Sequence, residues 1–158
     1  IGKDLVELLQ PWGCTLLAND ILDFPDFYLH YGVTPVGLEE LLQRSDVVTL
    51  HVPLDESTRN MLSATRLALM KPSAILINAA RGGLVDEAAL KAMLVTKRLA
   101  AAAFDVFAVE PPQDQELLAL PNFLVSPHIG GSAEEATLAM GRAAISGLNE
   151  NSIPDVTD

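Results

Sequence analysis

Cysteine, aromatic residues and basic residues are scarce in this sequence, and each shortage excludes a class of protein. The one cysteine, Cys14, cannot form an internal disulfide and has no CxxC companion for a structural zinc, which favours a reducing, cytoplasmic environment. Aromatic residues make up only 5%, which argues against an aromatic-rich sandwich or barrel. The sequence has only 10 basic residues and 21 acidic ones. The resulting net charge of -11 repels phosphate backbones, so nucleic acid is not an expected partner.

Long apolar runs are missing as well. A helix that spans a bilayer needs about 18 continuous apolar residues, and no stretch reaches that length. The chain also does not open with a basic segment followed by an apolar run, so neither a targeting signal nor a membrane partner is predicted. What is abundant is apolar sequence rich in leucine and alanine, 49% of 158 residues, which suits one domain with helices packed on a sheet.

Short apolar runs alternate with longer helical patterns along most of the chain. This alternation is typical of βαβ units and predicts an α/β fold with a parallel sheet. We expect strands at 15–19, 47–51, 74–78, 102–106 and 123–127. We expect helices near 3–11, 37–44, 63–70, 86–95 and 131–148, the last opened by Ser132 and Glu135 at capping-box spacing.

Three chemically distinct side chains follow three successive predicted strands. They are Arg81 in AARGG, Glu110 in FAVEPP and His128 in PHIGG. Ligands of open parallel sheets bind beyond the carboxyl ends of the strands, so all three residues belong to the rim where a site is expected. Each taken alone is more often a solvated or structural loop residue. The neighbouring Gly82–Gly83 and Gly130–Gly131 pairs would let a ligand approach the backbone closely.

The chemistry of these three residues suits one reaction class. A histidine beside a carboxylate can act as a general base on a substrate hydroxyl and return the proton in the reverse direction. An arginine fork can hold a substrate carboxylate through two hydrogen bonds. Since no side chain accepts a hydride, a nicotinamide cofactor would have to supply that function.

The beginning of the chain offers a place for such a cofactor. Gly2 opens the first predicted helix, whose amides could hold a pyrophosphate. Asp20 follows the first predicted strand at the distance expected for the acidic residue that binds the ribose hydroxyls of a dinucleotide. A carboxylate there favours NAD over NADP, although Asp20 could also simply begin a turn.

Four long segments resemble the D-isomer-specific 2-hydroxyacid dehydrogenases, most closely their phosphoglycerate dehydrogenase-like branch. These segments read HVPLDESTRNML, LMKPSAILINAARGGLVDEAAL, AAFDVFAVEPP and FLVSPHIGGSAEEA. The resemblance implies a Rossmann-type doubly wound parallel sheet and an NAD-dependent enzyme. Its substrates would be small 2-hydroxy and 2-oxo acids, and the active protein would be a homodimer.

The resemblance also implies a role for individual residues. His128 would be the acid/base, Glu110 its carboxylate partner and Arg81 the anchor of the substrate carboxylate. The cofactor would be bound by Ile1, Gly2, Asp20, Val52, Pro53, Thr58, Ala80, Asp105 and Gly130. His51 is the rival base because it also ends a predicted strand, and His30 is interpreted as a loop residue. No metal site is predicted.

In this family a strand and two glycines come before the residues that read IGK here. We therefore expect a sheet of order 3-2-1-4-5-6 without its central strand, and no separate substrate domain. The predicted organisation is a dinucleotide-binding domain over 1–130, a small-residue helix over 131–150 that would pack on the substrate domain, and a tail over 151–158. The alternatives to an enzyme are a non-catalytic NAD-sensing module and an inactive fragment, because fold alone does not fix function.

Overall fold

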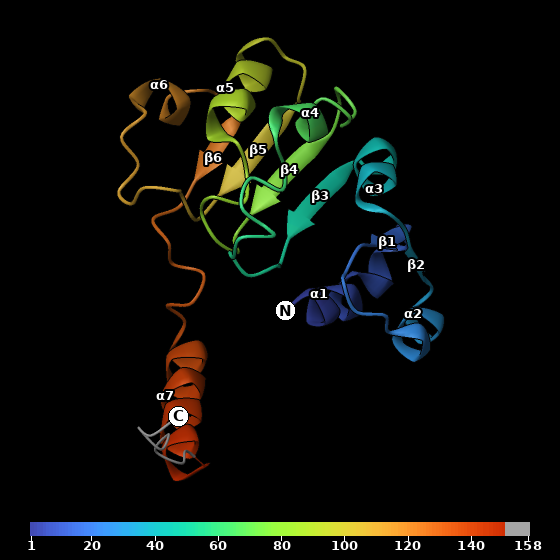
Figure 1. The fold of residues 1–158 in the computed structure, drawn as a ribbon, viewed down its shortest axis with the longest axis vertical. Helices are drawn as coiled ribbons and strands as arrows, with labels where there is room; N and C mark the ends of the chain where they lie inside the picture. Colours follow the sequence, from blue (N-terminus) through green and yellow to red (C-terminus); the bar gives the residue numbers. More distant parts are fainter. Residues whose placement is uncertain (151–158) are drawn as a thin grey trace, which may run out of the picture. The chain divides into compact units, whose positions relative to one another are not determined.

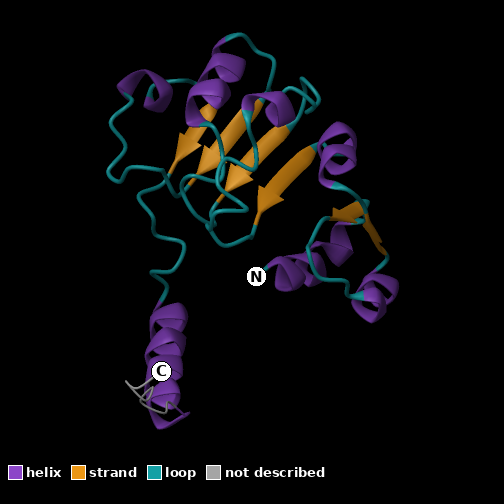
Figure 2. Cartoon of the chain, viewed as in Figure 1, coloured by secondary structure: helices purple, strands orange, loops and turns teal. Residues whose placement is uncertain are grey.

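The computed structural model describes residues 1–150. Its strands form two separate sheets, each made of parallel strands (Figure 2). The smaller sheet pairs β1 (Leu16–Ala18) with β2 (Val33–Pro35). The larger sheet has the order β3-β4-β5-β6, formed by Val47–Leu50, Ile75–Asn78, Ala101–Phe104 and Phe123–Val125. Every pair of neighbouring strands is parallel, which confirms the predicted α/β class.

Helices connect these strands in the order expected of βαβ units (Figure 1). The helices are α1 (Gly2–Leu9), α2 (Pro25–Tyr31), α3 (Leu38–Arg44), α4 (Ala64–Leu67), α5 (Glu87–Val95), α6 (Gln115–Leu118) and α7 (Glu134–Glu150), and a short 3-10 turn, η1 (Gln10–Trp12), follows α1. Each of the five predicted strands exists, one or two residues shorter than expected, and β5 begins one residue earlier than predicted, at Ala101. Helix α4 is shorter than the predicted segment 63–70, because its last residues form bonds of 3-10 type, from Leu69 to Arg66 and from Met70 to Leu67.

The sequence pattern missed α2, β2 and α6. His30 lies on α2, so its interpretation as a loop residue is wrong. Helix α2 has only seven residues and begins with Pro25, and its aromatic residues have modest helix propensity. Tertiary contacts stabilise it instead, since Lys3 of α1 lies 3.5 Å from the centre of the Phe24 ring and Gln10 donates to the Tyr31 carbonyl. β2 contains Pro35 and only three residues, which hid it from a periodicity search.

No pairing joins β1 to β3 within residues 1–150, which is the position where the sequence predicts the missing central strand. The smaller sheet and the larger sheet therefore each have an unpaired edge there. This arrangement agrees with the order 3-2-1-4-5-6 interrupted at its first strand.

The core of the larger sheet lies between one face of the strands and helices α3 to α6. Alternate residues of β3 and β4 are buried, as the period of two requires when one face is covered. The fully buried side chains include Leu42, Leu62, Leu67, Leu76, Leu84, Leu90 and Leu99. Burial of this leucine-rich cluster fixes the register of the strands, and the register fixes which residues lie at their carboxyl ends.

The chain divides into two compact units, Ile1–Pro127 and His128–Asp158. The second unit contains α7, which begins at Glu134, three residues later than expected. Ala133, and not Ser132, accepts the first helical hydrogen bond, from Thr137. The apolar side chains Leu138, Met140, Ile145 and Leu148 of this helix are exposed. The predicted tail over 151–158 lies outside the described residues.

Candidate active site

The loop that follows β4 carries Arg81 and is held by a buried asparagine. Asn78, the last residue of β4, is only 1% exposed. Its Oδ1 accepts from the Ala80 amide at 3.1 Å, and its Nδ2 donates to the Arg81 carbonyl at 2.9 Å. One side chain thus bonds the backbone on both sides of the Ala80–Arg81 peptide. The exposed Arg81 guanidinium folds back on this turn, where its Nη1 donates to the Ala80 carbonyl at 2.7 Å.

The loop that follows β5 carries Asp105 and Glu110. Asp105 is buried, and its Oδ1 accepts a 2.6 Å hydrogen bond from the Ser126 hydroxyl at the end of β6. Glu110 turns back on its own loop, where its Oε1 accepts from the Phe107 amide at 3.0 Å. The backbone of this loop therefore sets the position of the Glu110 carboxylate.

The loops after β4 and β5 are in direct contact. A Cβ added to Gly82 would lie 1.8 Å from the Phe107 carbonyl oxygen, so only glycine fits at this position. Gly83 has a φ of 81°, which glycine adopts without strain. The sequence led us to expect that these glycines admit a ligand; at Gly82 the close neighbour is instead the backbone of the other loop. Arg81 and Glu110 consequently lie on adjoining loops of the first unit.

His128 is the first residue of the second unit, and it is exposed. Its φ of 54° lies in the left-handed region, which few residues other than glycine adopt. Such backbone conformations cluster at functional sites. Gly130, two residues later, is also exposed.

The segment that follows β3 brings His51 to the beginning of α1. A Cβ added to Gly2 would lie 3.7 Å from His51 Cδ2, and Thr49 Oγ1 lies 3.2 Å from His51 Nε2. Burial lowers the pKa of His51. A neutral imidazole is therefore favoured beside the amide end of α1.

Val52 and Pro53 come next, followed by a tight turn that Asp55 and Thr58 close. The Thr58 hydroxyl donates to the Pro53 carbonyl at 2.7 Å and accepts from the Asp55 amide at 2.8 Å. Asp55 Oδ1 in turn accepts from Ser57 and Thr58, and these bonds lower the pKa of Asp55. Thr58 thus shapes the loop that contains Val52 and Pro53.

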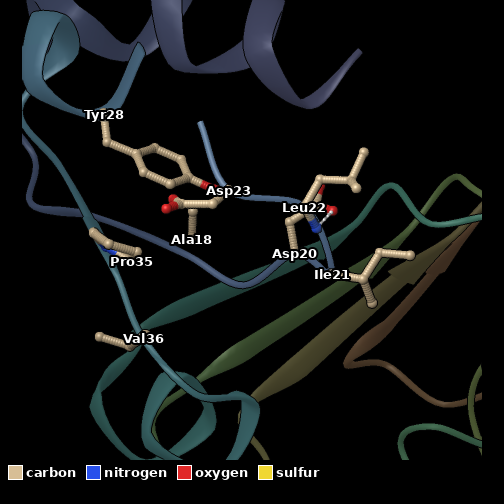
Figure 3. A pocket seen from close by; sticks show the side chains of 8 residues that line it. All are labelled: Ala18, Asp20, Ile21, Leu22, Asp23, Tyr28, Pro35 and Val36. Atoms are coloured by element: carbon tan, nitrogen blue, oxygen red, sulfur yellow. Dashed lines mark hydrogen bonds between the residues drawn. The ribbon is translucent and has the colours of Figure 1, made fainter. Parts of the chain in front are cut away.

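A pocket lies at the carboxyl ends of β1 and β2 (Figure 3). Asp20 lies in it, and its Oδ1 accepts from the Leu22 amide at 2.9 Å, so Asp20 does begin a turn as well as lining the pocket. A second carboxylate, Asp23, also lines the pocket; it was not predicted from the sequence, where its one signal is its spacing of three residues from Asp20. Burial raises the pKa of Tyr28, and the charges of Asp20 and Asp23 raise it further. The remaining lining residues are Ala18, Ile21, Leu22, Pro35 and Val36.

These features fit a dinucleotide. The first amides of α1 lack helical partners and Ile1 provides no side-chain cap, which suits a pyrophosphate. The pocket carboxylates suit ribose hydroxyls and repel an additional phosphate. Among residues 1–150, no group of three or more histidine, cysteine or acidic side chains is arranged to hold a metal ion. No helix in this part of the chain is long and apolar enough to cross a membrane.

Curated proteins of known activity match most of this chain. Glycerate dehydrogenase of Methylorubrum extorquens is 47% identical over 139 residues, which are 86% of this chain and 42% of that protein. D-3-phosphoglycerate dehydrogenase of Escherichia coli is 49% identical over 138 residues, or 80% of this chain and 34% of that protein. The chain therefore spans about two fifths or less of the length of these curated relatives.

Solved structures give the same result. A D-lactate dehydrogenase from Sporolactobacillus superimposes with a TM-score of 0.84 at 41% identity, covering 92% of this chain and 48% of that one. D-lactate dehydrogenase with NAD+ from Lactobacillus jensenii gives 0.82 at 31% identity, covering 100% and 52%. Residues 1–130 match the family model of the D-isomer specific 2-hydroxyacid dehydrogenase NAD binding domain. The chain belongs to the D-isomer specific 2-hydroxyacid dehydrogenase family, of which it contains the NAD-binding domain.

Proposed function

We propose that this chain is the cofactor-binding part of an oxidoreductase that interconverts a D-2-hydroxy acid and a 2-oxo acid. The observation that carries the proposal is the contact between two rim loops, one with Arg81 and one with Glu110, in a domain of this family. The partners would be a small-molecule acid and, as in the resemblance, a second copy of the chain in a homodimer. The scarcity of cysteine supports a cytoplasmic location.

Each catalytic residue has a role that follows from its chemistry. Arg81 would bind the substrate carboxylate, because its planar guanidinium offers two parallel donors. His128 would take the proton of the 2-hydroxyl in one direction and return it to the 2-oxo oxygen in the other. Glu110 would be the carboxylate partner of His128 and would orient the imidazole for this proton transfer.

The cofactor would be held by the beginning of α1 and by residues that follow five of the strands. Gly2 and the amides of α1 suit the pyrophosphate, Asp20 the adenosine ribose, and Val52, Pro53 and Thr58 the adenine side. Ala80, Asp105 and Gly130 would surround the nicotinamide. Asp105 suits the carboxamide, since a carboxylate accepts hydrogen bonds from an N–H₂ group. When bound, NAD supplies the hydride acceptor that no side chain provides.

The decisive experiment replaces His128 by alanine in the full-length protein. We expect turnover of a panel of 2-oxo acids with NADH to fall by about a thousandfold or more, because acid/base catalysis contributes on the order of 10²–10⁴. NADH affinity should stay nearly unchanged. His30→Ala, on the exposed end of α2, is the matched control and should keep full turnover. Loss of turnover in His51→Ala with retention in His128→Ala would make His51 the base.

Cofactor choice is tested at Asp20. Asp20→Ala should weaken NAD binding and narrow the preference for NAD over NADP, because a carboxylate in the pocket repels the 2′-phosphate. Asp26→Ala, which removes an exposed carboxylate from the first turn of α2, is the control. An unchanged preference in Asp20→Ala would move the ribose contact elsewhere, and Asp23 would then be the next residue to replace.

A further inference from the structure

The peptide group between Phe107 and Ala108 is the joint at which the two rim loops meet. The Phe107 amide donates to Glu110, and the Phe107 carbonyl lies against the Cα of Gly82 in the loop of Arg81. The next amide, that of Ala108, donates to Glu87 Oε1 at 2.8 Å. Three contacts within two residues thus connect the Glu110 loop to itself, to the Arg81 loop and to α5.

Glu87 is a rigid support for this joint. It is the first residue of α5, and the preceding residue, Asp86, caps the helix by accepting from the Ala89 amide at 3.0 Å. The same helix buries Leu90 and Leu94 in the core. A carboxylate anchored in this way holds its hydrogen-bond partner in one place, because the helix that carries it is packed into the core.

We propose that Glu87 is a positioning residue of the active site, which sets the place of Glu110 relative to Arg81 by holding the Ala108 amide. The inference rests on the proposed function, because it requires that Arg81 and Glu110 both act on the substrate. Glu87 itself does not touch the reacting atoms. Its effect reaches them through the backbone that runs from Ala108 to Glu110.

A simpler reading of Glu87 is that of an acidic residue in the first turn of a helix, where it stabilises the helix dipole. That role needs only a negative charge near the first turn. The positioning role needs an oxygen that reaches the Ala108 amide, whether charged or not. The two readings therefore predict different orders of activity among substitutions at residue 87.

Three variants of the full-length protein separate the readings. Glu87→Gln keeps the acceptor oxygen without the charge, Glu87→Asp keeps the charge on a shorter side chain, and Glu87→Ala removes both. We expect Glu87→Gln to keep kcat within about threefold of the unmodified protein. Glu87→Asp and Glu87→Ala should lose roughly ten- to a hundredfold in kcat, because small displacements of positioned groups cost up to about that factor.

NADH affinity, measured by the enhancement of nicotinamide fluorescence, should be unchanged in all three variants, because the displaced group acts on the substrate. Glu40→Ala is the matched control. Glu40 also lies in the first turn of a helix, α3, and pairs with exposed Arg44 four residues later, so its removal should leave kcat intact. The Gln and Asp variants decide the question even if Glu87→Ala does not fold.

Retained kcat in Glu87→Asp together with a loss in Glu87→Gln would overturn the inference, since charge would then be what matters. Equal and unchanged kcat in all variants would overturn it as well. Failure of the proposed function is recognised separately: full-length protein with no turnover of any 2-oxo acid, or His128→Ala and Arg81→Ala with normal turnover, would refute the function itself before residue 87 is compared.

Discussion

Replacement of Asn78 by alanine tests how the Arg81 loop is held. The variant loses two side-chain hydrogen bonds, to the Ala80 amide and the Arg81 carbonyl, at about 1 kcal/mol each. It also leaves a small cavity next to Phe104, the buried residue that pairs with residue 78 on β5, which adds about 1 kcal/mol. We expect the free energy of unfolding to fall by about 3 kcal/mol, a large share of the roughly 5–15 kcal/mol of a typical domain.

Urea denaturation followed by circular dichroism measures this loss, with the slope checked for two-state behaviour. The matched control is Asn122→Ala. Asn122 also donates to two carbonyls, those of Leu94 and Ala100, but it precedes β6 and so lies at the opposite end of the sheet from the active-site rim. Both variants should be less stable, and only Asn78→Ala should also lower turnover. A loss below about 1 kcal/mol in Asn78→Ala would refute the reasoning.

Two further predictions concern the contact between the rim loops and the response to acid. Gly82→Ala should lower the free energy of unfolding by about 1–3 kcal/mol, because its Cβ would overlap the Phe107 carbonyl. Gly37→Ala, with open space around it, is the control and should cost less than about 1 kcal/mol. Equal losses of stability in thermal melting of the two variants would contradict this reasoning. The bond from Lys91 to Asp114, with the amide of Leu117, holds the pKa of Asp114 below its ordinary value. Because the folded-state pKa is the lower one, this stabilisation is present above pH of about 4 and disappears as the pH falls through the folded-state pKa. Melting temperatures should therefore separate the chain from its Asp114→Asn variant near pH 7 and converge in acid, and a constant difference would be the contrary result.

The sequence predicted the parallel sheet, and every strand of the described residues except β2, because local patterns specify strands. Runs such as ILIN and VVTL are apolar, short and β-branched, and the helical segments between them have another period. Gly2, Asp20, Arg81 and Glu110 were correctly expected after strand ends or at a helix start, since a strand end is itself a local feature. The places of these four residues in the fold could thus be predicted from the chain alone.

Asn78 carried a signal that was not used, because a polar residue that ends an apolar strand is unusual. Glu87 carried none: its partner, the Ala108 amide, is 21 residues away and belongs to a loop with no periodicity. Helix α2 was not predicted, because contacts of Lys3 and Gln10 with its aromatic residues and backbone stabilise it. Helix propensity does not measure such contacts.

What the sequence determined by itself was the class of fold and the family. Only the tertiary structure decided that Gly82 serves the neighbouring loop, that Asn78 holds the Arg81 turn, and that Asp23 shares a pocket with Asp20. The physical reason is distance along the chain. Patterns of hydropathy and helix caps act over a few residues, whereas close packing and hydrogen bonds between loops depend on how the sheet brings separate segments together.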